Sequence, residues 1–231
     1  MFVIPCKYNP VLPFVIQLVD DIRKFHPDDK IVVVDSDSED KTYLKTLSEK
    51  YGAITEDIAN RNWMIGAYWY AYKKYPDEDF YFFMHDSMRV KANLDYLKEK
   101  DLTILMTFNR KFGPYNGWAD RINAETDYRY EIDGLGCYGP IFFCKNKVMK
   151  GMLDMGTDKF LPTNKQETHY SERAYGVFLE GQGYDLRECN MYGDVLNEES
   201  PTGRSGPYPH NTSWQYPIEK FYASIVDKKR L

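Results

Sequence analysis

Two acidic residues directly follow apolar segments of this 231-residue chain. Asp35 ends the run KIVVVD at residues 30–35, and Asp86 lies in the tripeptide HDS that follows FYFFM at residues 80–84. A carboxylate at a strand end can accept hydrogen bonds from a nucleoside base or ribose, or can hold a divalent cation that bridges two phosphates. Both segments also have a plain structural interpretation, in which the polar residues only cap a helix or a strand end.

A third acid, Glu172, is expected in the first turn of a helix predicted over residues 168–180. The positive end of a helix favours a carboxylate there, and a well-placed glutamate can take a proton from a hydroxyl group. A purely structural role at the helix N-terminus is the alternative, and Glu167 is the second candidate for such a base. A catalytic site requires that the acids converge on one rim of the sheet.

Basic residues and histidines could contact a phosphate or a metal ion. Lys7 follows the first predicted strand, and Arg61 precedes an aromatic helix, where a guanidinium would fit phosphate oxygens. His85 could ligate a metal ion beside Asp86, and His210 could complete the metal shell or contact a diphosphate. Each of these side chains could equally be solvated.

The elements that must position these residues alternate between strands and helices. Apolar runs and helical spacing predict strands at residues 2–5, 30–35, 80–84, 102–107 and 141–144, and helices at 10–25, 41–51, 62–75, 147–155, 168–180 and 214–226. Strands separated by helices form crossovers in a mostly parallel sheet. We therefore expect an α/β, Rossmann-like fold with helices flanking a mostly parallel central sheet, in which ligands bind beyond the carboxyl ends of the strands.

No linker or internal repeat divides the chain. The sequence predicts one domain over residues 1–231, with a nucleotide-binding half at 1–108 and an acceptor-side half with a C-terminal tail at 109–231.

The second half contains a glycine-rich loop and several aromatic residues. The loop GLGCYGP at residues 134–140, which includes Gly136, permits a close backbone approach to a ligand. Trp118, Tyr138 and Trp214 are candidate sugar-stacking platforms, although each could instead pack in the core.

Composition and charge disfavour several classes of protein. The formal net charge of -5 disfavours nucleic-acid binding, and 43% hydrophobic with 28% charged residues argues against disorder. The four cysteines form no CxxC pair, which predicts free buried thiols of a reducing compartment and no zinc site. A P-loop and a GxSxG motif are absent. With no signal-peptide pattern and no run of 18 apolar residues, we expect a soluble, cytoplasmic protein without a transmembrane segment.

The order of these segments resembles that of the GT-A glycosyltransferases, particularly their small virus- and bacterium-type members. The resemblance covers roughly residues 2–215 and rests on VIPCKYN, VVVDSDSED, an Asn/Arg segment before a helix, HDS, the glycine-rich loop and SER…GQGY. It implies a GT-A fold and transfer of a sugar from a nucleotide-diphosphate donor, with UDP-sugars favoured, to a glycan or another hydroxyl acceptor.

The resemblance also implies roles for individual residues. The residues that would contact the donor nucleotide are Pro5, Tyr8, Asp35, Arg61, His85 and Asp86, with Asp35 on the uracil or equivalent base. The HDS tripeptide takes the place of the family's DxD motif, so Asp86 with His210 would hold Mn²⁺ or Mg²⁺. Glu172 matches the catalytic base of inverting members. The residues expected on the acceptor and sugar side are Trp118, Gly136, Tyr138 and Trp214.

Three other functions stay open at this point. A retaining transferase or sugar-nucleotide hydrolase would use the same donor with different stereochemistry or a different acceptor. A nucleotidyltransferase normally has a glycine-rich basic loop after its first strand, which CKYNPVLP does not provide. The single acid in HDS leaves open a non-catalytic sugar-nucleotide-binding module on a degenerate transferase fold.

Overall fold

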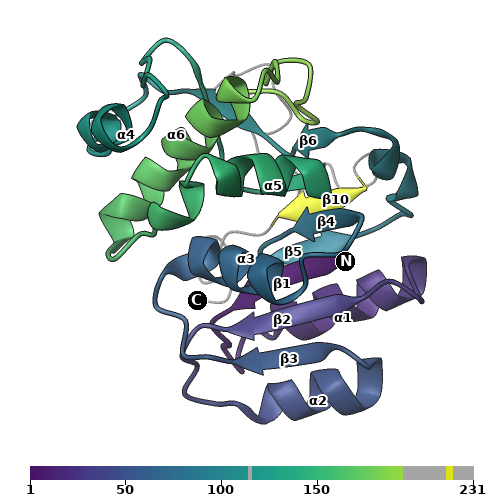
Figure 1. The fold of residues 1–231 in the computed structure, drawn as a ribbon. Helices are drawn as coiled ribbons and strands as arrows, with labels where there is room; N and C mark the ends of the chain where they lie inside the picture. The colour runs from purple at the N-terminus through teal and green to yellow at the C-terminus, as the bar shows by residue number, and fades with distance from the viewer. Residues whose placement is uncertain (114–115, 195–216, 221–231) are drawn as a thin grey trace.

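A computed structural model of the chain describes residues 1–113, 116–194 and 217–220, and it has a six-stranded sheet between layers of helices (Figure 1). The strands are β1 (Phe2–Cys6), β2 (Ile31–Asp35), β3 (Ile54–Asp57), β4 (Phe80–Phe83), β5 (Met88–Val90), β6 (Leu102–Ile104), β7 (Thr107–Asn109), β8 (Leu135–Cys137), β9 (Phe142–Lys145) and β10 (Ile218–Lys220). The helices are α1 (Phe14–Phe25), α2 (Thr42–Tyr51), α3 (Trp63–Lys74), α4 (Ala119–Glu125), α5 (Asn146–Asp154) and α6 (Lys165–Gly181), with short 3-10 helices η1 (Asp95–Glu99) and η2 (Thr157–Lys159).

The strand order of the main sheet is β3-β2-β1-β4-β9-β6. The first four of these strands run parallel, while β9 runs antiparallel to both of its neighbours. The chain moves outward from β1 to β2 and β3 and then returns to pair β4 with the other edge of β1. This reversal is a topological switch point, and in open α/β sheets ligands bind at such a point beyond the carboxyl ends of the strands. The predicted α/β fold with a mostly parallel sheet is confirmed.

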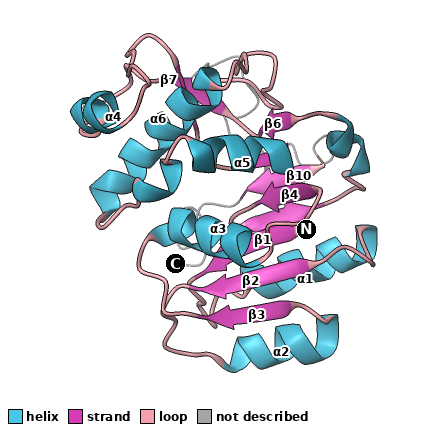
Figure 2. Cartoon of the chain, in the orientation of Figure 1, coloured by secondary structure: helices cyan, strands magenta, loops and turns pink. Residues whose placement is uncertain are grey.

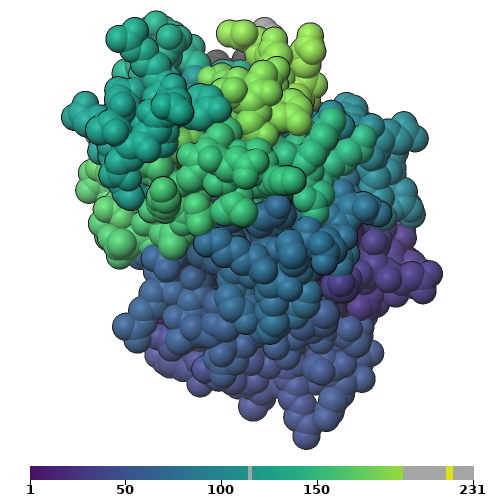
Figure 3. All heavy atoms as spheres, viewed as in Figure 1, coloured from purple at the N-terminus to yellow at the C-terminus, as the bar shows by residue number. Residues whose placement is uncertain are grey.

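Alternate residues of the central strands face the two helical layers, because successive side chains of a strand point to opposite faces. Val3 and Phe83 pack with α3, α5 and α6, whereas Phe2 and Phe82 pack with α1 and α2. Figure 2 shows α3 across the near side of the sheet with α5 and α6 above it. In Figure 3 the N-terminal part of the chain, in purple and blue, forms the lower part of this face, and green segments of the C-terminal half form the upper part.

The sequence predicts free cysteine thiols and no transmembrane segment, and the structure bears on both points. All four cysteines have free thiols, and three of them are buried: Cys6, Cys137 and Cys144. Within the part of the chain that the structure describes, no helix has the length and apolar character that crossing a bilayer requires.

The structure shifts or divides some of the predicted elements. The helix predicted over residues 10–25 begins at Phe14, because residues 10–12 form a turn in which Asn9 Oδ1 accepts a hydrogen bond from Val11 N (2.9 Å). The strand predicted at 102–107 divides into β6 and β7, since Leu105 N leaves the strand ladder and donates to Ile141 O (3.0 Å).

Four short strands were not predicted, and one predicted helix is wrong. β3 and β5 have the sequences ITED and MRV, which contain too few apolar residues to indicate a strand, and β8 lies inside the segment predicted as a loop. The helix predicted at 214–226 is replaced, over the residues described there, by β10, which pairs antiparallel with β5. The free edge of β5 supplies backbone partners that decide the conformation of this segment.

The start of α6 changes the interpretation of two acids. α6 begins at Lys165, and the N-cap residue Asn164 accepts a hydrogen bond from Glu167 N (3.1 Å). Glu167 accepts from Thr163 N (2.7 Å), so its carboxylate belongs to the helix cap. Glu172 is therefore not in the first turn, as predicted, but in the third.

Helix α6 is fixed closely against the β7–β8 ribbon, and this contact sets the position of Glu172. A Cβ atom at Gly176 would overlap the backbone oxygen of Leu135, so the helix can approach β8 only with glycine here. One turn further along, Glu180 accepts from Leu135 N (3.1 Å) and forms an ion pair with Arg110. Glu172 lies one turn before Gly176 on the same helix.

Gly176→Ala is expected to destabilise the protein. The overlap is with backbone, which no side-chain rotation relieves, so overpacking of about 1–3 kcal/mol outweighs the gain of up to about 1 kcal/mol in helix propensity. Urea unfolding should give a lower free energy of unfolding than for the wild type. The exposed Gln166→Ala on the same helix is the control and should stay within about 0.5 kcal/mol. Equal stability of Gly176→Ala and wild type would show that α6 is not held against β8 in this way.

Candidate functional site

A cavity of about 400 Å³ opens at the carboxyl ends of β1, β2, β3 and β4, where the switch point lies. Its lining residues are Pro5, Cys6, Lys7, Ser36, Asp37, Asn60, Arg61, Trp63, Met64, His85 and Asp86. Concave sites of this size that combine apolar walls with a few polar groups are typical ligand-binding sites.

Backbone strain in the described chain gathers around this cavity. Among the described residues, the non-glycine residues with positive φ are Asp37 (63°), Ala59 (46°) and Trp63 (48°). Asp37 and Trp63 line the cavity, and Ala59 precedes the lining residue Asn60. A positive φ is costly for a residue as bulky as tryptophan, and such strain is found mostly at ligand-binding and catalytic sites.

Asn60 joins two walls of the cavity. Its Nδ2 donates to Trp63 O (2.6 Å) and to Ser36 Oγ (3.2 Å), and its Oδ1 accepts from Asn62 N (3.1 Å). A Cβ atom at Gly66 would overlap Asn60 Oδ1, so the glycine of α3 leaves room for this side chain. The loops after β2 and β3 are thereby held in one arrangement.

The structure corrects the predicted role of Asp35. This residue is fully buried, its Oδ1 accepts from Ser38 N (3.0 Å), and its Oδ2 accepts from Tyr43 OH (2.7 Å). Burial would raise the pKa of Asp35, but the hydrogen bonds from Ser38 and Tyr43 outweigh burial and lower the pKa below its usual value. Asp35 is not among the residues that line the cavity, whereas Ser36 and Asp37 are.

Tyr8 also lies outside the cavity lining. Its ring stacks on Tyr43 at 4.4 Å between centroids, and its backbone N donates to Ser38 Oγ (2.8 Å). Tyr8 therefore stabilises the loop that follows Asp35, through its contacts with Ser38 and Tyr43.

The other predicted donor-contact residues do line the cavity: Pro5, Arg61, His85 and Asp86. The Arg61 side chain is 82% exposed and its Nη2 lies 3.8 Å from Asp37 Oδ2, so the guanidinium faces solvent at the opening. Lys7, also exposed, adds a second cation to the lining. Two cations at the opening favour an anionic ligand.

A lysine that the sequence analysis missed lies against the HDS tripeptide. Lys220, on β10, is only 7% exposed, and its Nζ lies 2.7 Å from His85 Nδ1. Nothing in the segment IEK indicates such a residue, because lysines are mostly exposed and β10 itself was predicted as helix. Only the pairing of β10 with β5 carries Lys220 to this place.

Burial and charge together set the protonation of this group of side chains. Burial lowers the pKa of Lys220 to about 8, against the opposing effect of the Glu172 and Asp86 carboxylates. Burial, followed by the charge of Lys220, lowers the pKa of His85 well below its usual range. Burial raises the pKa of Asp86 to about 6, against hydrogen bonds that include the Cys6 thiol. At neutral pH the imidazole is thus neutral, accepts from the Lys220 ammonium at Nδ1 and carries its proton at Nε2.

Glu172 belongs to the same group of charges. Its Oε1 accepts from Gly139 N (3.1 Å), its Oε2 lies 3.7 Å from His169 Nδ1, and the side chain is 16% exposed. Gly139 has φ 61°, and a Cβ atom there would lie 3.2 Å from both His85 Cε1 and Lys220 Nζ. Glycine thus allows the loop after β8 to hold Glu172 close to Lys220.

Two residues predicted to face a sugar are buried instead. Trp118 is 6% exposed, with edge contacts to Phe160 and Tyr170. A Cβ atom at Gly136 would overlap the ring of Phe108, so this glycine serves close packing.

The remaining acceptor-side predictions divide differently. The ring of Tyr138 lies 5.8 Å from Lys220 Nζ, next to the group of charges. His210 and Trp214 lie outside the described residues, so the structure says nothing of their roles.

The glycine-rich loop is not a dinucleotide-binding turn. The hexapeptide GLGCYG at 134–139 has GxGxxG spacing, but it contains β8 and leads to the strand β9, whereas a dinucleotide-binding turn leads to a helix.

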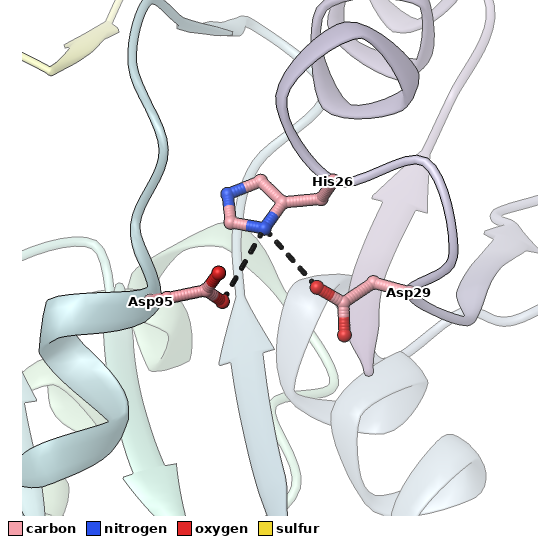
Figure 4. A group of neighbouring side chains, drawn as sticks. All are labelled: His26, Asp29 and Asp95. Carbon is pink, nitrogen blue, oxygen red and sulfur yellow. Dashed lines mark hydrogen bonds and ion pairs between the residues drawn. The ribbon is translucent and has the colours of Figure 1, made fainter.

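One cluster in the described part of the chain brings three possible metal ligands together: His26, Asp29 and Asp95 (Figure 4). It lies at the amino end of β2, opposite the cavity. His26 Nε2 accepts from Leu94 N (3.0 Å), so Nδ1 carries the proton and donates to Asp29 Oδ2 (3.1 Å). Lys98 forms ion pairs with both aspartates. With both ring nitrogens used, the cluster is a structural clamp.

The predicted metal site at Asp86 does not fit a divalent cation in the described residues. His85 Nδ1 accepts from an ammonium group, and Asp86 supplies a single carboxylate. Hard divalent cations require several oxygen ligands, and Lys220 would repel one electrostatically.

Comparisons with known proteins give structural matches only. No family model matches the chain, and no curated protein matches it in sequence. The structural matches named below have identities of 11–14% and TM-scores of 0.41–0.48. One match is S. aureus TarS (residues 1–349) in complex with UDP, at 13% identity, over 74% of this chain and 53% of that chain, with a TM-score of 0.44.

Two further matches have the same character. They are GalNAc-T7 with UDP, GalNAc and Mn²⁺ (11% identity, 74% of this chain, 39% of that chain, TM-score 0.48) and the galactosyltransferase LgtC with donor and acceptor sugar analogues (14%, 77%, 70%, 0.41). The chain spans about half the length of the TarS fragment. At these identities and TM-scores the matches assign no role to any residue, and residue roles depend on the site itself.

The His26 clamp predicts a specific loss of stability in acid. The hydrogen bond from His26 is the largest cause that lowers the pKa of Asp29 to about 2, below the value near 4 of an unfolded chain. The stabilisation, on the order of 2 kcal/mol, is present above about pH 4 and is lost as the pH falls towards 2. Urea unfolding between pH 5 and pH 2 should therefore show a shallower decline for Asp29→Asn than for the wild type.

The neighbouring, exposed Asp28 provides the matched control, and Asp28→Asn should decline as the wild type does. An equally steep decline of Asp29→Asn would contradict the assigned role of His26.

Proposed function

We propose that this protein is a glycosyltransferase that moves a sugar from a nucleotide-diphosphate donor to a hydroxyl group of an acceptor. The observation that carries the proposal is the strained cavity at the switch point, with Arg61 and Lys7 at its opening and the His85–Asp86 wall next to Lys220 and Glu172. A cavity large enough for a nucleoside base, two cations at its opening and a carboxylate that could accept a proton therefore lie next to one another.

In this proposal the nucleoside occupies the cavity. Pro5, Trp63 and Met64 offer apolar wall to a base, and Ser36 and Asp37 offer hydrogen-bonding groups to the base or ribose. The diphosphate extends towards the His85–Asp86 wall, which directs the sugar to the side of Glu172. UDP-sugars are tested first, because the sequence resemblance implies a uracil site.

The chemical step requires one bond to form as another breaks. The acceptor oxygen bonds to the anomeric carbon, the bond from that carbon to the donor's phosphate oxygen breaks, and its electron pair leaves with the nucleoside diphosphate. Glu172 takes the acceptor's proton at Oε2, because Oε1 already accepts from Gly139 N; His169 Nδ1 lies 3.7 Å from Oε2. In-line attack inverts the anomeric configuration, and general-base help of this kind contributes about 10²- to 10⁴-fold to the rate.

Reversing the charge at the opening should weaken donor binding. Arg61 is largely exposed, so Arg61→Glu should leave the free energy of unfolding within about 0.5 kcal/mol while weakening nucleotide binding by about tenfold or more, as expected for loss of a charged contact to phosphate. The measurement is calorimetric titration with UDP-, GDP- and dTDP-sugars. Arg129→Glu, an exposed arginine outside the cavity lining, is the matched control.

If none of these donors binds the wild type, or if the two charge reversals weaken binding equally, the cavity is not the donor site. Binding without transfer to any acceptor or to water would favour the non-catalytic module.

Glu172→Gln should keep donor binding and lose about 10²- to 10⁴-fold in transfer, since only the proton acceptor is removed. The readout is single-turnover transfer, or donor hydrolysis where no acceptor is known, together with the donor dissociation constant. Glu167→Gln tests the second candidate; because Glu167 belongs to the helix cap, that variant should transfer normally. Full activity of Glu172→Gln, or a product with retained anomeric configuration, would remove Glu172 from the proposed role.

A further inference from the structure

Lys220 has surroundings that a lysine seldom has. Its Nζ is within hydrogen-bonding distance of the cavity-lining His85, and the Asp86 and Glu172 carboxylates both act on its charge. Removing an ammonium group from water is unfavourable unless opposite charges offset the cost, and here the charges of two acids contribute to that. A buried cation therefore lies between the wall of the proposed donor cavity and the proposed base.

The position of Lys220 is fixed by its strand. β10 pairs antiparallel with β5, the strand that begins directly after HDS. Ile218 exchanges hydrogen bonds with the Tyr192 hydroxyl through its N and O atoms (3.1 and 3.0 Å), and the buried Glu219 forms an ion pair with Lys91 (2.6 Å). The ammonium thus comes from a strand held on both sides of the backbone and not from a free surface chain.

The same position is where the sequence predicts a divalent cation, and the residues that the structure describes there do not fit one. Asp86 is the single carboxylate of HDS, and the imidazole beside it accepts from the ammonium. A nucleoside diphosphate nevertheless needs positive charge, most of all when its bond to the sugar breaks and negative charge grows on the leaving oxygen. A lysine ammonium is a compact point charge that can meet this need.

We propose that Lys220 supplies the positive charge on which the donor's diphosphate binds, in place of a divalent cation. The inference rests on the proposed donor cavity and names the group that distinguishes a diphosphate from a bare nucleoside there. On departure of the leaving group, the electron pair of the broken bond remains on a phosphate oxygen next to the Lys220 ammonium.

The first experiment measures nucleotide binding with and without a metal ion. UDP, GDP, dTDP, CDP and ADP are titrated into the wild-type protein by calorimetry, once in EDTA and once in MnCl₂ or MgCl₂. The expected result is that at least one diphosphate binds in EDTA and that the metals change its dissociation constant by no more than about threefold. Such a change is small compared with the change in affinity expected from one charged hydrogen bond.

The possible outcomes separate the two proposals. Binding that requires Mn²⁺ or Mg²⁺ would overturn the proposed role of Lys220, but the proposal that the cavity binds the donor would still hold. Absence of binding for every diphosphate under both conditions would overturn the proposed function itself.

Variants of Lys220 then test the residue. Lys220→Met, which keeps the length and removes the charge, should weaken diphosphate binding in EDTA by about 10- to 100-fold, as expected for one charged hydrogen bond. Binding of the matching nucleoside, followed by ligand-observed NMR, should stay unchanged and reports an intact cavity. Lys220→Arg should retain most of the diphosphate affinity, and the exposed Lys150→Met controls for net charge.

Equal loss of nucleoside and diphosphate binding in Lys220→Met, with no recovery in Lys220→Arg, would show a structural role. Unchanged diphosphate binding in Lys220→Met would overturn the proposal directly.

Discussion

The candidate site depends on a buried lysine ammonium that contacts a neutral imidazole and is stabilised by the charges of two carboxylates. Lys220, His85, Asp86 and Glu172 come from three segments far apart in the sequence. Isolated burial of any one of these charges would be costly, whereas their combination offsets much of the cost. The group therefore exists only when the end of β4, α6 and β10 are assembled, which couples the chemistry to the complete fold.

The order of the strands explains why the cavity and this group of charges adjoin. β1 pairs with β2 on one edge and with β4 on the other, so the chain leaves the sheet in opposite directions at the two strand ends. The loops after β2 and β3 form one wall, the HDS tripeptide after β4 forms the opposite one, and α6 reaches the far side of HDS through Gly139. The positive φ angles of Asp37 and Trp63 mark the places where those loops are bent to shape the cavity.

Much of this architecture could be predicted from the sequence, because it depends on local patterns. Long apolar runs such as FYFFM indicate buried strands wherever they occur, and their order leads to an α/β sheet whose strand ends carry Asp35 and Asp86. The direction in which a side chain points could not be predicted in the same way. Asp35 turns to Ser38 and Tyr43, since their hydrogen-bond donors lie inside, and no spacing rule tells which of three neighbouring polar residues will face a ligand.

The residues that were missed depend on contacts between distant segments. Lys220 lies in a segment whose apolar spacing favours a helix when considered alone, and only the edge of β5 makes it a strand. The position of Lys220 beside HDS explains why this tripeptide contains a single acid. A divalent cation needs more than one anionic ligand, whereas a single ammonium is balanced by fewer carboxylates. The HDS tripeptide needs to supply only one aspartate and a neutral histidine beside the Lys220 ammonium, because Glu172 supplies a second carboxylate from α6. The missing second acid in HDS is therefore consistent with a working site and does not by itself indicate a degenerate one.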